Sequence, residues 1–439
     1  MMGVNLSVTP LDAWVRKEIG GNGPLTTAVI DAEQLKRLNA TLALAARYSP
    51  FYRKRLAGYD IVLRRMEDLV HLPFTDAEDL KREALRFPCV SQEEISRVVT
   101  LGTSGTTGAA KRLFFTREDQ ERTMEFFQWG MKALTDPGDR VLILFPVNTP
   151  GGVGDLLAAA VRRLGATPVL HGPLTQRCQA AELLKEEPFS VIAGPPVPVL
   201  ALAYDWQQRG WGGQMPKRAL LSADYVPHSV VKHLREIWNC EVFGHYGMTE
   251  MGLGGGVECA AHDGYHLREA DLYFEVIDPV SGVRKSAGEE GEVVFTTLTR
   301  QGMPLIRYRT GDISRLLPGR CACGSRLRRL GTVTSRRDGV RCPGRERQLA
   351  LADLDEMLFK IHGVVDYTAV LRENGDKRQL LLQVLALSGE TMRCELEPVL
   401  AELLSPDVID WRLDLMPWRN NLLFNGAKRV LERKRVDAH

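Results

Sequence analysis

The chain carries at residues 103 to 111 the stretch Thr103-Ser104-Gly105-Thr106-Thr107-Gly108-Ala109-Ala110-Lys111. It follows a β-branched run that predicts a strand (97–100) and precedes a helical pattern (117–133). Glycines let backbone N–H groups turn toward an anion, hydroxyls donate to its oxygens, and the lysine adds positive charge. The stretch therefore predicts a polyphosphate-binding loop, with a solvated linker as the alternative. It is not a Walker A loop, because no Gly-Lys-Ser/Thr follows its first glycine at the required spacing.

Composition limits the classes of function. The 439 residues are 44% hydrophobic and 26% charged, with a formal net charge of +2, as in an ordinary soluble enzyme. A chain of this length predicts one large domain and at least one smaller one. Near-neutral charge indicates neither nucleic acid nor a membrane surface as a partner. The arginine-rich run 326–341 and the tail 428–435 are local exceptions, and we interpret both as solvated faces.

Targeting signals and cysteines indicate the compartment. The amino terminus lacks a basic segment followed by an apolar core, and no apolar run is long enough to cross a bilayer, so we expect a cytoplasmic protein. Eight cysteines in a chain this long do not suggest a disulfide scaffold. Five of them stand alone in the sequence and are interpreted as core or incidental residues: Cys89, Cys178, Cys240, Cys342 and Cys394.

Buried-strand patterns recur through the first half of the chain, each followed by a Gly- or Pro-rich turn and a helix. They lie at 140–146, 190–195, 219–224 and 240–247. This alternation predicts an α/β fold with doubly wound sheets. Ligands of such sheets bind at the carboxyl ends of the strands, where these turns lie.

From Leu272 the pattern changes to β-hairpins, which predicts a β subdomain of about 272–334. Within it, residues 304–312 predict a strand that ends in a tight turn at Gly311-Asp312. An arginine-rich hinge near Ser335 to Asp338 then divides the chain. We expect a large N-terminal domain at 1–336 and a small, mobile α+β lid at 337–439.

Four stretches in this order resemble the adenylate-forming superfamily of acyl-CoA synthetases, adenylation domains and luciferases. They are residues 103–111, Tyr246-Gly247-Met248-Thr249-Glu250, Tyr308-Arg309-Thr310-Gly311-Asp312 and Ser335-Arg336-Arg337-Asp338. Residues 49–52, 72–75, 258–259 and 306–310 are similar to the phenylacetate-CoA ligase branch. Singly, each motif is a turn or a hairpin end; the ordered set is specific, and it spans roughly residues 45 to 340.

The resemblance implies an ATP site. A carboxylate must attack the α-phosphorus of ATP in line, so positioning and charge neutralisation supply most of the catalysis. By the resemblance, the 103–108 loop with Lys111 holds the phosphates, Glu250 holds Mg²⁺, Asp312 accepts the ribose hydroxyls and Arg336 contacts the ribose or α-phosphate. The adenine would lie against Tyr246 and the residues Ala223, Asp224, Tyr225, Gly247, Met248 and Thr249.

The acyl pocket is expected between the turn after residue 145 and the glycine-rich segment 252–256. Phe145, Gly151 and Gly254 are its candidate lining residues, the glycines leaving space beside the α-phosphate. With Phe145 and Met248 as walls, the pocket would suit an aromatic or other hydrophobic acid. Core packing is the alternative role for these residues.

A second constellation combines cysteines and histidines. Thiolates and imidazoles in fours are the ligand set of structural Zn²⁺, and some relatives in the branch carry zinc on similarly placed residues. The resemblance implies Cys259, Cys321 and Cys323 as ligands, with either His262 or His266 as the fourth. Reduced cysteines beside a turn are the alternative.

The chain departs from the family pattern in three places that bear on the lid. Ser335 replaces the glycine that usually precedes Arg336, and 340–348 match the hinge-to-lid pattern poorly. The catalytic lysine of the family follows a glycine near the C-terminus; here Gly426 is followed by Ala427, which makes Lys428 the candidate. A solvated tail lysine is the alternative.

The sequence thus predicts an ATP-dependent, Mg²⁺-requiring acid–CoA ligase that acts on a small carboxylic acid through an acyl adenylate. One alternative is an adenylating enzyme that loads a carrier protein or an amine. Another is a non-catalytic, zinc-containing nucleotide-binding protein, suggested by the altered lid motif. A homodimer is expected by analogy with relatives.

Overall fold

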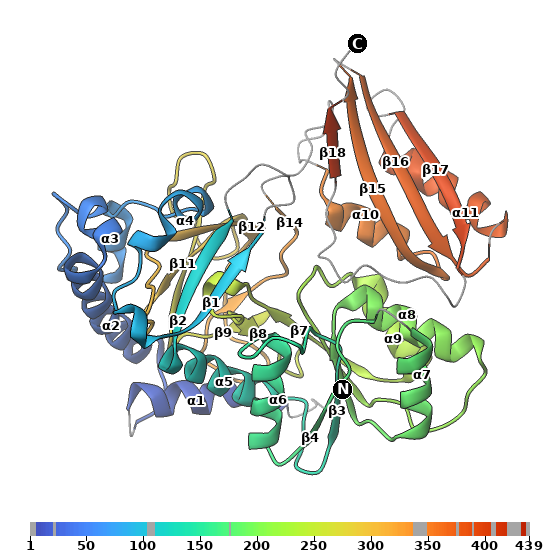
Figure 1. Cartoon of the computed structure of the whole chain (residues 1–439), viewed down its shortest axis with the longest axis horizontal. Coiled ribbons are helices and arrows are strands. Elements are labelled where there is room, and N and C mark those ends of the chain that lie inside the picture. The colour runs from blue at the N-terminus through green and yellow to red at the C-terminus, as the bar shows by residue number, and fades with distance from the viewer. Residues whose placement is uncertain are drawn as a thin grey trace. The chain divides into compact units, whose positions relative to one another are not determined.

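A computed structural model describes residues 6–20, 23–102, 110–174, 177–336, 349–374, 377–388, 390–404, 410–418 and 432–435 (Figure 1). Its contacts divide the chain into two units. The first comprises Met1–Pro137, Asn148–Ala166 and Phe243–Val333, and the second comprises Gly138–Val147, Thr167–Val242 and Thr334–His439. The expected domain boundary at 336/337 stays a prediction.

The described part of the first unit contains six α-helices. Its helices are α1 (Pro10–Ile19), α2 (Thr27–Tyr48), α3 (Pro50–Arg55), α4 (Ala77–Glu83), α5 (Arg117–Met131) and α6 (Val153–Arg163). Thr26 caps α2 by accepting a hydrogen bond from Val29 N at 3.2 Å, and Thr116 caps α5 through Asp119 N at 3.1 Å. Asp119 also accepts from the backbone N–H groups of Gln301 and Gly302 at 3.0 and 3.1 Å, so the start of α5 is fixed to the chain just before β12.

Strands of the first unit form three groups. β1 (Ile95–Leu101) and β2 (Lys111–Thr116) pair antiparallel and lie side by side in Figure 1. β10 (Leu272–Ile277), β11 (Gly291–Thr297) and β12 (Tyr308–Ser314) form an antiparallel sheet. β7 (Glu241–Tyr246), β8 (Gly256–Val257), β9 (Tyr265–Leu267) and β13 (Arg329–Leu330) pair antiparallel in that order. The expected β subdomain therefore forms, and one core packs α2 and α3 against β10–β12.

The second unit contains the parallel strands that the buried apolar runs predict. β3 (Arg140–Ile143), β4 (Thr167–Leu170), β5 (Val191–Gly194) and β6 (Arg218–Leu221) are all parallel, in the order β6-β5-β3-β4. The connecting helices are α7 (Arg177–Glu186), α8 (Pro196–Gln208) and α9 (His228–Trp238). The doubly wound α/β prediction is confirmed.

The C-terminal part of the second unit is α+β, as expected. It consists of α10 (Leu351–Leu358), β15 (Val364–Asn374), β16 (Lys377–Ala386), α11 (Glu390–Leu403), β17 (Asp410–Pro417) and β18 (Glu432–Arg435). The strand order is β17-β16-β15-β18, and β16 pairs antiparallel with β15 and parallel with β17 (Figure 1). Its core is continuous with that of α8 and α9, where Tyr204 OH accepts from Gly363 N at 3.1 Å. Among the described residues, no helix is long and apolar enough to cross a membrane.

One buried ion pair ties the β subdomain to the segment before α4. Arg307, at the start of β12, donates to both carboxylate oxygens of Glu275 at 3.1 and 3.0 Å and to the carbonyls of Val70 and Leu72 at 2.9 and 2.8 Å. Its guanidinium also lies 4.0 Å from the ring centroid of Phe74. The two charged side chains are 2% and 1% exposed, so neither charge has water as a substitute partner.

We therefore predict that Arg307→Met lowers the free energy of unfolding by about 3–5 kcal/mol, because it leaves Glu275 buried and uncompensated. Urea denaturation of the purified protein measures this. Lys36→Met is the control, since the Lys36–Glu33 pair is on the surface and its loss should cost under about 1 kcal/mol. Equal losses for the two variants would contradict the prediction.

Candidate active site

The loop at residues 103–111 lies only partly within the described residues. Residues 103–109 are outside them, so the predicted phosphate contacts of Thr103, Ser104, Gly105, Thr106, Thr107 and Gly108 stay predictions. Its flanks are described: Leu101 of β1 pairs with Lys111 of β2, so the loop joins two antiparallel strands. The sequence predicted the first strand and missed the second. Lys111 is thereby fixed at the point where the chain leaves the loop.

Glu250 lies in the 3₁₀ turn η4 (Thr249–Met251), and both its carboxylate and its backbone carbonyl accept hydrogen bonds. Its carboxylate oxygen Oε1 accepts hydrogen bonds from Lys111 Nζ and from Tyr308 OH, the latter at 3.2 Å. Its backbone carbonyl accepts from Arg300 Nη1 at 2.6 Å. The side chain is only 3% exposed. Burial, with a smaller opposing influence from Asp119, lowers the pKa of Arg300 to about 10, which leaves it charged at neutral pH.

Asp312 lies on β12, and Tyr246 OH donates to its Oδ2 atom at 3.0 Å. The expectation that the strand ends in a tight turn at Gly311-Asp312 is wrong, because β12 continues to Ser314. Gly311 has a φ of 76°, and the register with β11 shifts there, so the backbone bulges and then resumes pairing. The bulge keeps Asp312 within the sheet.

Each of the two acidic residues accepts a hydrogen bond from a tyrosine of the other motif. Tyr246, from the first motif, donates to Asp312 of the second, and Tyr308, from the second motif, donates to Glu250 of the first. The structure thus brings Glu250, Asp312, Tyr246 and Lys111 together, and their roles toward the nucleotide stay predictions. It adds Tyr308, to which the sequence argument gave no role. The four-residue spacing was the available signal, since period-two alternation along a regular strand would place Tyr308 and Asp312 on one face.

The motif 246–250 folds as a closed loop. Leu253 N donates to Met248 O at 2.9 Å, and Gly255 N donates to Tyr246 O at 2.9 Å. A Cβ atom at Gly247 would lie 2.5 Å from Leu253 O, so only glycine fits this close approach. Tyr246 is buried and its ring stacks on Tyr265 at 6.1 Å between centroids. The predicted adenine contacts of Tyr246, Gly247, Met248 and Thr249 stay predictions.

The glycines proposed to leave space in an acyl pocket are instead crowded. A Cβ atom at Gly254 would lie 2.3 Å from the Phe126 ring, and one at Gly151 would lie 2.1 Å from Gln120 Nε2. The space beside each glycine is therefore already filled by a side chain. Phe145 is 3% exposed and belongs to the second unit. The assignment of these three residues to the acid stays a prediction.

The remaining predicted nucleotide and lid residues fall in the second unit. Ala223 has a φ of 73°, Asp224 accepts from Tyr225 N at 2.9 Å, and Tyr225 OH donates to Glu356 of α10 at 2.6 Å. Arg336 lies in the two-residue strand β14 (Ser335–Arg336). Lys428 lies outside the described residues, so its role stays a prediction.

Four side chains of types that can bind a metal converge in the first unit. The donor atoms of Cys259, His266, Cys321 and Cys323 all lie within 4.8 Å of one another, and all four residues are buried. The Sγ atoms of Cys259 and Cys321 are 3.6 Å apart, and Cys323 Sγ is 3.4 Å from His266 Nε2. His262, the other candidate, lies instead with its ring 5.0 Å from that of Phe243 and its Nδ1 atom 3.6 Å from Glu258. Of the two candidate histidines, only His266 lies with the three cysteines.

Burial raises the pKa of the Cys259 and Cys321 thiols. Burial acts in the same direction on Cys323, but the hydrogen bonds with His266 and with the backbone at Ser325 and Thr9 together outweigh it and lower the pKa of this thiol to about 6. The cluster sits where β9 pairs with β13, because Arg329 lies opposite His266 in that register. The donor atoms of Cys321 and Cys323 lie close to that of His266 beside this strand pair.

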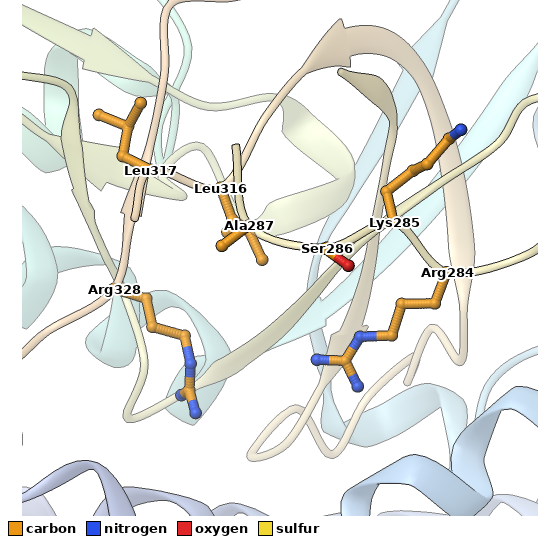
Figure 2. A pocket seen from close by; sticks show the side chains of 7 residues that line it. All are labelled: Arg284, Lys285, Ser286, Ala287, Leu316, Leu317 and Arg328. Carbon is orange, nitrogen blue, oxygen red and sulfur yellow. The ribbon is translucent and has the colours of Figure 1, made fainter. Parts of the chain in front are cut away.

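A pocket of about 410 Å³ lies elsewhere in the first unit, lined by Arg284, Lys285, Ser286, Ala287, Leu316, Leu317 and Arg328 (Figure 2). Two of its three cationic side chains have acidic partners. Arg328 pairs with Asp31 and Glu269, and Lys285 Nζ is 3.7 Å from Asp278. Figure 2 shows the Lys285 side chain extending away from those of Arg284 and Arg328. None of the predicted nucleotide residues lines this pocket, and its charge balance does not indicate a phosphate site.

Comparison with known proteins adds sequence relatives. A family model described as AMP-binding enzyme matches residues 61–299. The phenylacetate-coenzyme A ligase of Thermus thermophilus is 32% identical over 371 residues, which are 81% of this chain and 81% of the relative. That of Pseudomonas putida is 31% identical over 334 residues, 72% of this chain and 73% of the relative.

Solved structures share the fold. A crystal structure of 2-hydroxyisobutyryl-CoA ligase in the postadenylation state with 2-HIB-AMP matches with a TM-score of 0.79 at 22% identity, over 93% of this chain and 90% of that chain. A benzoate CoA ligase from Burkholderia xenovorans matches with a TM-score of 0.52 at 15% identity, over 73% of this chain and 65% of that chain. At these identities the likeness is one of fold.

Proposed function

We infer the activity of this chain from its family, because it belongs to the AMP-binding enzymes and, within them, to the phenylacetate-CoA ligase-like branch. It is an AMP-forming acid–CoA ligase. The carboxylate of the acid attacks the α-phosphorus of ATP and expels pyrophosphate, which gives an acyl adenylate. The CoA thiol then attacks the acyl carbon, forms the thioester, and releases AMP and a proton.

The observation that best supports an adenylation site here is the reciprocal arrangement of Glu250 and Asp312. Each carboxylate is fixed by a tyrosine from the other motif, at 3.2 and 3.0 Å. Such preorganised groups need no reordering when charge develops in the reaction. We propose that Asp312 accepts the ribose hydroxyls of ATP and that the loop 103–108 donates to its phosphates. Arg336 is assigned to the ribose or α-phosphate, and Lys428 to the attacking carboxylate.

Glu250 is the proposed ligand of Mg²⁺. A carboxylate oxygen is a hard donor of the kind that this cation prefers, and Mg²⁺ bound to ATP characteristically takes few protein ligands. The cation would neutralise phosphate charge. Glu250 fits this role because its side chain is buried and oriented by Tyr308, so it presents the same carboxylate geometry at each turnover.

Zinc is the proposed ion of the cysteine cluster. Three thiols and one imidazole whose donor atoms lie within 4.8 Å of one another match the Cys₃His set of structural zinc. Four protein ligands leave no open position, so the role is structural. The ion would link the loop that carries Cys321 and Cys323 to β9 through His266 and to the turn at Cys259.

The acid is proposed to be aromatic or otherwise hydrophobic. This follows from the apolar expected lining and from the phenylacetate ligases among the relatives. CoA is favoured over a carrier protein as acceptor because the relatives named above are CoA ligases. The cytoplasmic location and the homodimer stay predictions.

A panel of acids tests this function. With ATP and Mg²⁺, at least one aryl acid should support ATP–pyrophosphate exchange without CoA, and adding CoA should then produce AMP and a thioester. Short alkyl and dicarboxylic acids form the comparison set. If ATP binds and no acid supports exchange, the non-catalytic alternative gains. Exchange without CoA-dependent AMP release would indicate a carrier or amine acceptor.

A further inference from the structure

We propose that Lys111 and Tyr308 position Glu250 in different ways, Lys111 as an exchangeable cation that stands in for the metal and Tyr308 as a permanent partner. This inference deepens the proposed function and rests on it. It starts from the shared contact: both side chains reach the same oxygen, Oε1 of Glu250. Neither residue is a catalytic group by this account, because both act through Glu250.

The charge of Glu250 requires a partner in the metal-free protein. Its side chain is 3% exposed, and an ionised carboxylate removed from water costs several kcal/mol unless it is paired. Arg300 contacts the backbone carbonyl of Glu250, whereas Lys111 contacts the carboxylate itself. The Lys111 ammonium therefore supplies the compensating charge at the position where a cation is expected.

Lys111 and Tyr308 differ in how freely each side chain can move away from Glu250. Lys111 is 20% exposed and stands at the exit of the 103–110 loop, and its flexible four-carbon stem can carry the ammonium elsewhere. Tyr308 is 1% exposed, lies within β12, and packs its ring on Phe295 at 5.4 Å between centroids. Because this ring is buried and packed, the Tyr308 hydroxyl keeps orienting Glu250 after Lys111 has moved.

The consequence is a coupling between metal and nucleotide. Without Mg²⁺, Lys111 screens the incoming phosphates from Glu250; with Mg²⁺, Glu250 binds the cation and Lys111 is released toward the loop. Removing Lys111 should harm metal-free binding of the nucleotide more than metal-dependent binding. Removing the Tyr308 hydroxyl should harm the metal-dependent binding more, because the carboxylate loses its fixed orientation.

Calorimetric titration of the whole protein with β,γ-methylene ATP measures this coupling without turnover. The quantity is the dissociation constant in EDTA divided by that in saturating Mg²⁺. We expect Lys111→Met to raise this ratio about tenfold and Tyr308→Phe to lower it about fivefold, within the usual range of coupling between two ligands. Lys111→Arg keeps the charge and should restore a ratio near the native one.

Tyr246→Phe is the matched control, since it removes the equivalent hydroxyl from Asp312 rather than from Glu250. It should leave the ratio unchanged even where it weakens both affinities. Equal weakening of both affinities in Lys111→Met would mean that the lysine binds phosphate in both states, and the exchange idea would be wrong. The same holds for Tyr308 if its variant behaves as Tyr246→Phe does. If the native protein does not bind the analogue at all, the proposed function fails instead.

Discussion

Glu250→Gln is expected to reduce ATP–pyrophosphate exchange by at least about 10²–10³-fold, the usual cost of removing one preorganised electrostatic group. Glutamine has nearly the same shape and can still accept the Tyr308 hydroxyl, so the loop 246–255 should keep its form. It lacks the negative charge through which a carboxylate attracts a divalent cation more strongly than a neutral amide oxygen does. The rate measured with a supporting acid at saturating Mg²⁺ is the test.

Two measurements make this result interpretable. The thermal midpoint of Glu250→Gln should stay close to that of the native protein, which excludes unfolding as the cause. Glu93→Gln, at an exposed glutamate, should exchange at the native rate. Near-native exchange by Glu250→Gln would refute its assignment as the metal ligand.

The second large effect is expected at the cysteine cluster. Cys323→Ser should remove bound zinc and lower the thermal midpoint by more than about 10 °C, because structural zinc contributes about 10 kcal/mol in small zinc domains and even half of that exceeds typical point-mutant effects. Metal analysis of the purified protein should find close to one zinc per native chain. Treatment with a strong chelator should reproduce the loss of stability.

The two histidines provide an internal control for this prediction. His266→Asn should lose zinc, whereas His262→Asn should retain it, because only His266 lies with the three cysteines. Cys394→Ser changes an exposed thiol and should alter neither quantity. Equal zinc content in both histidine variants would contradict the ligand set.

Sequence reasoning predicted the elements whose signal is local. The apolar runs of β3 and β5 indicate buried parallel strands because nearly every residue in each is apolar and both faces of such a strand are covered. The pairing of Glu250 and Asp312 with the nucleotide rested on ordered motifs. Their convergence in the first unit agrees with that order.

The features that the sequence did not determine depend on strand register and on contacts between residues far apart in the chain. His262 and His266 both follow Cys259 within seven positions, and spacing alone does not choose between them; the pairing of Arg329 with His266 does. Gly311 was interpreted as the end of a strand because Gly-Asp usually marks a turn, whereas the bulge against β11 lets the strand continue. At Gly254 the glycine accommodates Phe126, which lies 128 positions away in the chain.

Strand β12 carries both Tyr308, which orients the proposed metal ligand, and Asp312, the proposed ribose ligand. Three residues lie between them, so the two positions are four residue steps apart, about 13 Å along an extended strand. One continuous piece of backbone thus sets the distance between the proposed ribose ligand and the tyrosine that orients the proposed metal ligand, and the buried Arg307 anchors the chain just before it. Inserting or deleting a residue at the Gly311 bulge would change that length while leaving every functional side chain present, so the enzyme's discrimination between mono-, di- and triphosphates should depend on this bulge.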